Sequence, residues 1–197
     1  MSSDCRFIMS KKSKAFVICA FTVLVAAIVA VIFYYGRSSV TKTLYPTKYS
    51  EFVETYCEKY NLEKSFIYAV IKCESDFDKD AVSSVNAKGL MQLMPDTFDW
   101  LKMRLKEPDL SEDMMFDPET SIRFGCYLYR YLIDDFGDVE VAVAAYHAGL
   151  GNAAKWLKNK EYSDDGKTLK KIPFPSTEQY VNKVMKTKQI YEDLYDF

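Results

Sequence analysis

The sequence predicts a mainly α-helical protein with one membrane-spanning helix near its N-terminus. Beyond about residue 48, apolar residues recur at steps of three and four, whereas strand-like alternation is scarce. Nearer the start, residues 15–35 form an apolar run without a charged side chain. In a helix this run spans about 30 Å, which is the thickness of the hydrocarbon layer of a membrane.

The flanks of the apolar run predict an uncleaved anchor. Lys and Arg residues precede it, and Tyr34 and Tyr35 close it. A cleaved signal peptide is the alternative, but the run is longer than a typical signal-peptide core and no small-x-small cleavage site precedes Gly36. Because positive flanks stay inside, we expect a single-pass protein of the cell membrane with its domain on the extracellular side. The expected parts are a cytoplasmic tail (1–14), the anchor (15–35), a linker (36–47) and the external domain (48–197).

Composition and charge argue against two classes of function for the external domain, nucleic-acid binding and metal binding. The chain of 197 residues has a net charge of −2, and this argues against nucleic-acid binding. Its single His and the cysteine spacing predict no metal site. Cys57, Cys73 and Cys126 are an odd number, so they cannot all pair; we interpret them as buried hydrophobic residues, with a Cys73–Cys126 disulfide as the alternative. We expect a monomer, and the anchor without a lipobox Cys suggests a Gram-positive host.

Two helices and a long loop are predicted first. Residues 49–60 place apolar and aromatic side chains on one face. A second helix runs from about Leu62 to Ser75, with apolar residues at every third or fourth position. Residues 76–89 are polar and rich in turn formers, and this predicts a loop.

The rest of the chain continues as helices. Residues 90–105 predict a helix with Pro95 in its first turn. Asp117-Pro118 is a start signal for the next helix. Residues 139–146 are almost wholly apolar, as in a central buried helix. The segment 149–157 follows, residues 176–195 form the last helix, and a small hairpin is expected over Tyr162–Ile172.

Glu74 is unusual because it falls in the apolar register of the second helix. It lies four residues after Val70 and three after Ile71. One interpretation is a structural ion pair with a Lys, or a helix face that is less buried than the pattern suggests. The other is a carboxylic acid whose pKa is raised by desolvation, each unit being worth about 1.4 kcal/mol. Such an acid can protonate the leaving oxygen of a glycoside.

Two more segments strengthen the catalytic interpretation. "AKGLMQLMP" holds Gly89 and a polar Gln92 among apolar neighbours, and "AVAAYHAGLG" ends a buried helix with Tyr146 and two glycines. Taken singly, Met residues that fill gaps and Gly residues that cap helices explain these features. Together with the "ES" pair at 74–75, they form a set that chance rarely assembles.

The ordered motifs "AVIKCES", "AVSS", "AKGLMQLMPDT", "FDPETSIRFGCYL", "VAVAAYHAG" and "IPFPSTEQYV" resemble the soluble-lytic-transglycosylase family of peptidoglycan-cleaving domains, relatives of goose-type lysozyme. The resemblance covers roughly Tyr45 to Leu194. It implies a lysozyme-like helical domain whose groove binds glycan strands of peptidoglycan, and no cofactor.

The resemblance also implies roles for individual residues. Glu74 matches the family's catalytic acid. The substrate contacts correspond to Ser83, Gln92, Met94 and Tyr146, while Ser75, Gly89 and Gly149 would support the site. The chain departs from the family at His147, where Asn is usual, at Leu150, where Pro is frequent, and at Ser176, where Glu is usual. His147 is either a local substitution or a group that binds the N-acetyl or peptide part of substrate and makes activity pH-sensitive.

In such enzymes one acid suffices. It protonates the bond between N-acetylmuramic acid and N-acetylglucosamine, and the C6 hydroxyl of the muramic sugar then attacks C1 to form a 1,6-anhydro end. A two-carboxylate mechanism would need a partner for Glu74, and the nearby Asp76, Asp78 and Asp80 lie in a polar loop. The alternatives are a hydrolytic muramidase on the same fold, a non-catalytic glycan-binding module and a membrane-protein assembly factor.

Overall fold

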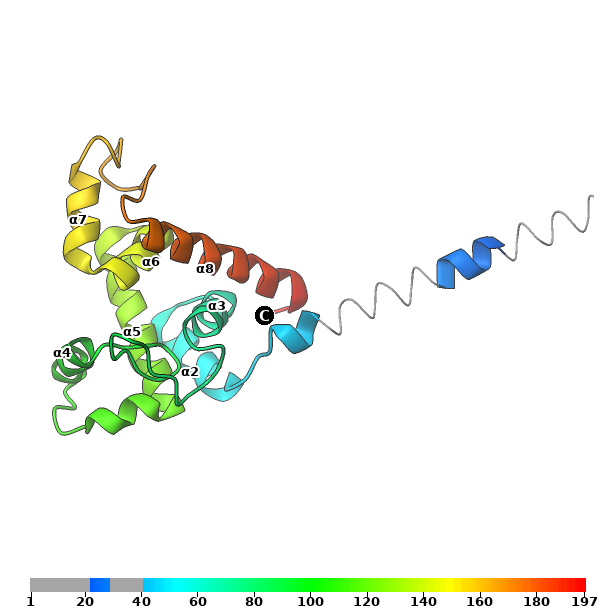
Figure 1. Cartoon of the computed structure of the whole chain (residues 1–197). Coiled ribbons are helices and arrows are strands. Elements are labelled where there is room, and N and C mark those ends of the chain that lie inside the picture. Colours follow the sequence, from blue (N-terminus) through cyan, green and yellow to red (C-terminus); the bar gives the residue numbers. More distant parts are fainter. Residues whose placement is uncertain (1–21, 29–40) are drawn as a thin grey trace, which may run out of the picture. The chain divides into compact units, whose positions relative to one another are not determined.

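A computed structural model describes residues 22–28 and 41–197 of the chain (Figure 1). The chain divides into two units, residues 1–46 and 47–197. In the first unit, residues 22–28 and 41–44 are helical, and most of the predicted tail, anchor and linker lies outside the described residues. No helix within the described ranges is both long and apolar enough to cross a membrane.

The second unit is mainly α-helical, as the sequence predicts. The described residues contain no strand, only two isolated antiparallel bridges, Val82 with Lys88 and Lys88 with Leu93. The elements are α2 (Ser50–Tyr60), α3 (Lys64–Glu74), α4 (Pro95–Leu105), the 3₁₀ helix η1 (Glu112–Phe116), α5 (Pro118–Phe136), α6 (Val139–Ala148), α7 (Leu150–Lys158) and α8 (Pro175–Leu194).

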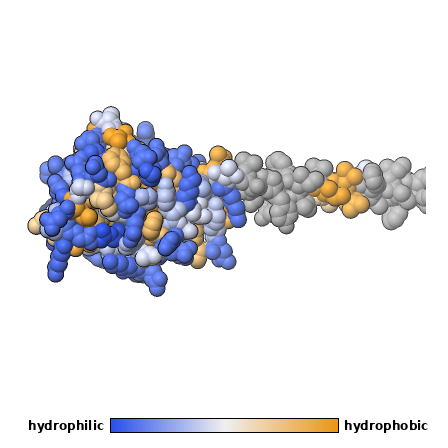
Figure 2. Space-filling model, turned by 90° about the horizontal axis from the view of Figure 1, so that it is seen from below, coloured by the Kyte–Doolittle hydropathy of each residue, from blue (hydrophilic) through white to orange (hydrophobic). Residues whose placement is uncertain are grey.

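The helices pack around α5 and α6. α3 lies along α8, α2 packs on α5, and α6 contacts α5, α7 and α8 (Figure 1). Residues 141–145 of α6 are completely or almost completely buried, which confirms the prediction of a central helix. The face seen in Figure 2 is mostly hydrophilic and carries only small, separate hydrophobic groups. The apolar residues that produce the periodicity of the sequence therefore lie mostly in the interior.

Capping aspartate side chains precede α5 and α6. The Asp117 side chain accepts a hydrogen bond from the Thr120 amide at 2.8 Å, directly before Pro118 opens α5. Asp138 caps α6 in the same way through the Val141 amide at 2.9 Å. A capping carboxylate satisfies one of the amides that the first turn leaves free.

Two predictions about local structure are wrong. The helix predicted over 90–105 begins only at Pro95, because Lys88 and Leu93 exchange two backbone hydrogen bonds of 3.0 and 3.1 Å around a tight turn. In place of the hairpin over Tyr162–Ile172, the Asp165 side chain accepts two backbone amide hydrogen bonds, each 2.8 Å long. These bonds hold an Asp-capped loop instead of paired strands.

The cysteines of the second unit are all free thiols. Cys57 and Cys126 are buried, as expected for small hydrophobic residues, and Cys73 is half-buried. The alternative Cys73–Cys126 disulfide is not formed.

Candidate active site

Glu74 is the last residue of α3 and lies at the end of a buried apolar face. Val70 and Ile71, the preceding residues of that face, are fully buried. The chain then turns sharply, since Asp76 and Phe77 both have positive φ angles, of 52° and 65°. Phe77 is only 3% exposed, so its buried ring helps to fix the turn. The carboxylate is thereby held where the core meets the surface.

The environment of Glu74 favours the protonated acid. Loss of solvent raises its pKa from the ordinary 4.5 to about 7, against the lowering effects of a hydrogen bond from Tyr180 and of the charge on Lys183. The Tyr180 hydroxyl donates to the Glu74 Oε1 atom. The Lys183 ammonium donates to the Cys73 carbonyl at 3.0 Å, and no salt bridge among the described residues includes Glu74. The interpretation of Glu74 as half of a structural ion pair is therefore not supported, because no described basic residue forms a salt bridge with it.

A row of aromatic rings adjoins the carboxylate. The Tyr180 hydroxyl lies 3.4 Å from the Tyr129 hydroxyl. The Tyr129 ring stacks on the Tyr146 ring with centroids 4.4 Å apart and planes 5° apart. Burial raises the pKa of the Tyr129, Tyr146 and Tyr180 hydroxyls well above 10, so all three stay neutral donors at physiological pH.

Tyr146 and Ser75 tie this row to the segment before α4. The Tyr146 hydroxyl donates to the Met91 carbonyl at 2.5 Å, which supplies the partner that a buried tyrosine needs. The Ser75 hydroxyl is 2.9 Å from the Leu90 carbonyl. Tyr146 and Ser75, the residue after Glu74, thus bind neighbouring carbonyls of one backbone segment.

Gly89 allows that segment to approach η1. Its φ is +75°, and a Cβ atom at this position would lie 1.9 Å from the Met115 carbonyl oxygen. No side chain fits there without moving the backbone.

Gln92 and Ser83 are engaged within the loop itself. The Gln92 amide nitrogen donates to the carbonyls of Ala81 at 3.1 Å and Gly89 at 2.9 Å. The Ser83 hydroxyl accepts the Ala87 amide at 2.9 Å. Both side chains shape the loop, whatever contact they also make with a ligand.

The remaining predicted residues lie farther along the site. Met94 is 41% exposed at the residue before α4. The His147 ring stacks on the Tyr180 ring with centroids 4.7 Å apart, and its Nδ1 atom lies 3.0 Å from the Thr177 hydroxyl. Partial loss of solvent lowers the pKa of His147, although the residue as a whole is exposed. His147 therefore contacts the partner of Glu74 and not Glu74 itself.

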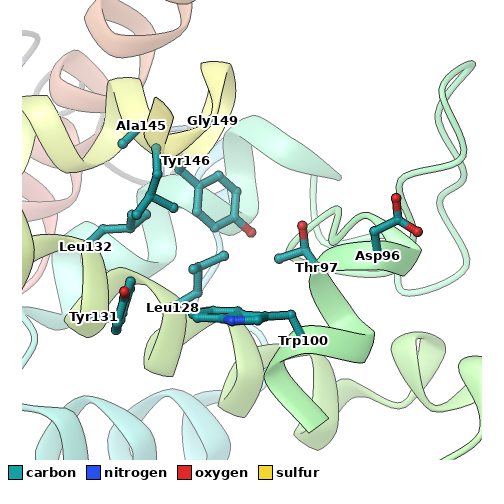
Figure 3. A pocket seen from close by; sticks show the side chains of 10 residues that line it. Asp96, Thr97, Trp100, Leu128, Tyr131, Leu132, Ala145, Tyr146 and Gly149 are labelled. Carbon is teal, nitrogen blue, oxygen red and sulfur yellow. The ribbon is translucent and has the colours of Figure 1, made fainter. Parts of the chain in front are cut away.

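A pocket of about 430 Å³ adjoins this arrangement (Figure 3). Tyr146 and Gly149 line it, together with residues of α4, α5 and α7, whereas Glu74 does not. Tyr146 is thus linked to the acid through Tyr129 and Tyr180. No group of three or more His, Cys, Asp or Glu side chains within the described ranges could hold a metal ion.

The sequence alone predicts no functional role for Tyr180 or Tyr129. Both are far from Glu74 in sequence; Tyr180 is 106 residues away. The sequence contains a signal that points to Tyr180: this residue borders an apolar stripe of α8, and Val181 and Val184 of that stripe are buried. A polar-tipped ring on such a stripe needs a buried partner.

The family model described as "Transglycosylase SLT domain" matches residues 51–169 of this chain. The soluble lytic murein transglycosylase of Escherichia coli K12 is 31% identical over 144 residues, which cover 72% of this chain and 22% of that protein. The membrane-bound lytic murein transglycosylase C of Serratia proteamaculans is 33% identical over 118 residues, or 55% of this chain and 33% of that protein.

Solved structures give the same result. A lytic transglycosylase from Pseudomonas aeruginosa, solved as an inactive variant with Gln in place of a Glu, has a TM-score of 0.66 and 30% identity over 76% of this chain and 25% of that chain. The complex of a 70-kDa soluble lytic transglycosylase with bulgecin A has a TM-score of 0.70 and 28% identity over 78% of this chain and 25% of that chain. The chain thus spans about a quarter of the length of these relatives.

Proposed function

Because the chain belongs to the transglycosylase SLT domain family, we propose that it is a peptidoglycan lytic transglycosylase. It cleaves the β-1,4 bond between N-acetylmuramic acid and N-acetylglucosamine and leaves 1,6-anhydromuramic ends. Relatives of this chain are named lytic murein transglycosylases, and one solved relative is an inactive variant with Gln in place of a Glu.

The observation that carries the proposal is the state of Glu74. With a pKa of about 7, the side chain holds its proton at neutral pH far more often than an ordinary glutamate does. Tyr180 donates to Oε1, and no described residue bonds to Oε2. The Oε2 atom is therefore free to carry the proton toward a glycosidic oxygen.

The reaction needs one carboxyl group in two roles. Protonated Glu74 first donates its proton to the glycosidic oxygen, and the bond from that oxygen to C1 of the muramic sugar breaks. The C6 hydroxyl of the same sugar then attacks C1 while the Glu74 carboxylate accepts its proton. Glu74 is restored and no water is consumed. The attacking hydroxyl is tethered to the ring, so positioning supplies much of the rate.

Other residues hold the sugar and the acid in place. Tyr180 orients the Glu74 carboxyl and stabilises its ionised form between the two steps. Tyr146 lines the neighbouring pocket and donates to the Met91 carbonyl. We assign contacts with the sugar to Gln92, Ser83 and Met94, and indirect support to the glycine and serine residues of the loop. His147 acts through its stacking on Tyr180.

Mass analysis of digested peptidoglycan tests the proposal. Wild-type protein should release fragments that are lighter by one water than fragments with reducing ends. Glu74→Gln should release none, whereas Glu58→Gln, on the exposed face of α2, should behave as wild type. Hydrated ends alone would identify a hydrolytic muramidase instead. Glycan binding without any cleavage would identify a binding module.

We also propose that residues 15–35 anchor the protein in the cell membrane with the catalytic unit outside. The support is the uncharged run and its basic N-terminal flank. Relatives named membrane-bound lytic murein transglycosylase C are compatible with a membrane location. The full chain should stay with membranes after alkaline carbonate washing, and release by the wash would contradict an anchor. The Gram-positive host stays a prediction.

A further inference from the structure

The pocket beside Tyr146 contains an exposed aromatic platform. Trp100 of α4 lines the pocket and is 37% exposed, although large aromatic side chains are mostly buried in cores. Its indole packs edge-to-face on Tyr131 of α5, with centroids 5.2 Å apart and planes 71° apart. The Arg104 guanidinium lies 5.3 Å from the Trp100 ring centre and 5.1 Å from that of Tyr131. These contacts fix the two rings without covering the pocket, which Arg104 does not line.

The rim of the pocket is polar on one side only. Asp96 and Thr97 project from the first turn of α4, while Leu128 and Leu132 line the side formed by α5 (Figure 3). No hydrogen bond or salt bridge within the described part of the chain involves the Asp96 carboxylate or the Thr97 hydroxyl. An apolar wall with a few free polar groups is the usual composition of a small-ligand site.

A row of tyrosine side chains links the pocket to the candidate active site. Tyr146 lines the pocket and stacks on Tyr129, whose hydroxyl is 3.4 Å from that of Tyr180, the donor to Glu74. A glycan strand bound at Glu74 would have to pass Tyr146 to reach the pocket, and the subsite inferred below assumes this course.

We propose that this pocket is a binding subsite for a neutral N-acetylhexosamine ring of the glycan strand, stacked on Trp100. The proposal rests on the proposed function and deepens it. One face of a pyranose ring consists of C–H groups and suits an aromatic surface, whereas its hydroxyl and acetamido groups suit Asp96 and Thr97 at the rim. The negative charge of Asp96 disfavours muramic acid, whose lactyl group or attached peptide brings carboxylates, so N-acetylglucosamine fits better.

Binding of an uncharged, peptide-free oligomer tests the subsite. The full chain with Glu74→Gln is titrated with the hexamer of N-acetylglucosamine in a calorimeter, so that cleavage does not interfere. Adding Trp100→Ala should weaken binding about tenfold, which is about 1.4 kcal/mol. Adding Met103→Ala, on the same helix, 68% exposed and outside the pocket, should change nothing. Equal affinity of the Trp100→Ala variant and its parent would overturn the proposal.

Tryptophan fluorescence gives a second, direct readout. The chain has two tryptophans, and Trp156 is 6% exposed against Phe174, outside the pocket. The hexamer should change the emission of the Glu74→Gln parent, and Trp100→Phe should abolish that change. A change that persists in Trp100→Phe would place the sugar elsewhere.

The experiments distinguish failure of the proposed function from failure of the subsite alone. If the parent binds no oligomer and wild type releases no anhydro fragments, both proposals fail. If wild type cleaves and the parent binds, but Trp100→Ala has no effect, only the subsite fails.

Discussion

Replacing Glu74 with Gln should stabilise the protein at alkaline pH while it abolishes activity. The pKa of Glu74 rises from 4.5 to about 7 on folding, because the folded chain excludes solvent from the carboxyl group. A carboxyl group with a raised pKa contributes stability that is fully present below its unfolded pKa and is lost as pH rises through its folded pKa. About 2.5 units at 1.36 kcal/mol each give about 3.4 kcal/mol. Gln cannot ionise, so the variant avoids this loss.

Urea unfolding of the full chain at pH 4 and pH 8 measures the effect. Wild type and Glu74→Gln should differ little at pH 4. At pH 8 the variant should be more stable by about 3 kcal/mol. Glu58→Gln serves as the matched control, because Glu58 is exposed on α2, and it should show no such pH-dependent gain. A variant that is equally stable or less stable than wild type at pH 8 would refute the argument that desolvation keeps Glu74 protonated.

Two further substitutions test the surroundings of the acid. Tyr180→Phe removes a hydrogen bond that lowers the pKa of Glu74, so the pKa should rise by about one unit, and the alkaline fall of cleavage activity should move to higher pH by the same amount. A pH profile of anhydro-fragment release measures the shift, and an unchanged or lower midpoint would exclude this role. Gly89→Ala places a Cβ atom 1.9 Å from the Met115 carbonyl oxygen at a φ of +75°, so urea unfolding should show a loss of about 2 kcal/mol or more. Gly151→Ala meets open space and should cost nothing; similar losses for both variants would show that the close approach at Gly89 is relaxed cheaply.

Most of the helical fold could be predicted from the sequence because its signals are local. The apolar periodicity around Val70 and Ile71 depends only on neighbouring residues, as does the Asp117-Pro118 start of α5. α4 starts later than the periodicity predicts because Gln92 adopts a φ of 47°, which the surrounding turn imposes on it. Periodicity alone could not reveal that an apolar run such as residues 90–94 is a turn.

The candidate site was predictable only in part, for a related reason. Glu74 stood out because a carboxylate in an apolar register is a local conflict. Its partner Tyr180 could not be identified from spacing, since the contact exists only when α8 lies along α3. Gln92 was recognised as unusual, but the use of its amide nitrogen by two backbone carbonyls depends on the exact shape of the loop.

The dependence of Glu74 on α8 has a consequence for biosynthesis. The tyrosine that donates a hydrogen bond to Glu74 lies on α8, 106 residues later in the sequence, and the same helix provides much of the cover of α3. A nascent chain that still lacks α8 has the glutamate but not its hydrogen-bond donor or its shielded surroundings. The proposed cleavage activity, which relies on this geometry, therefore requires that α8 has been synthesised and has docked on α3.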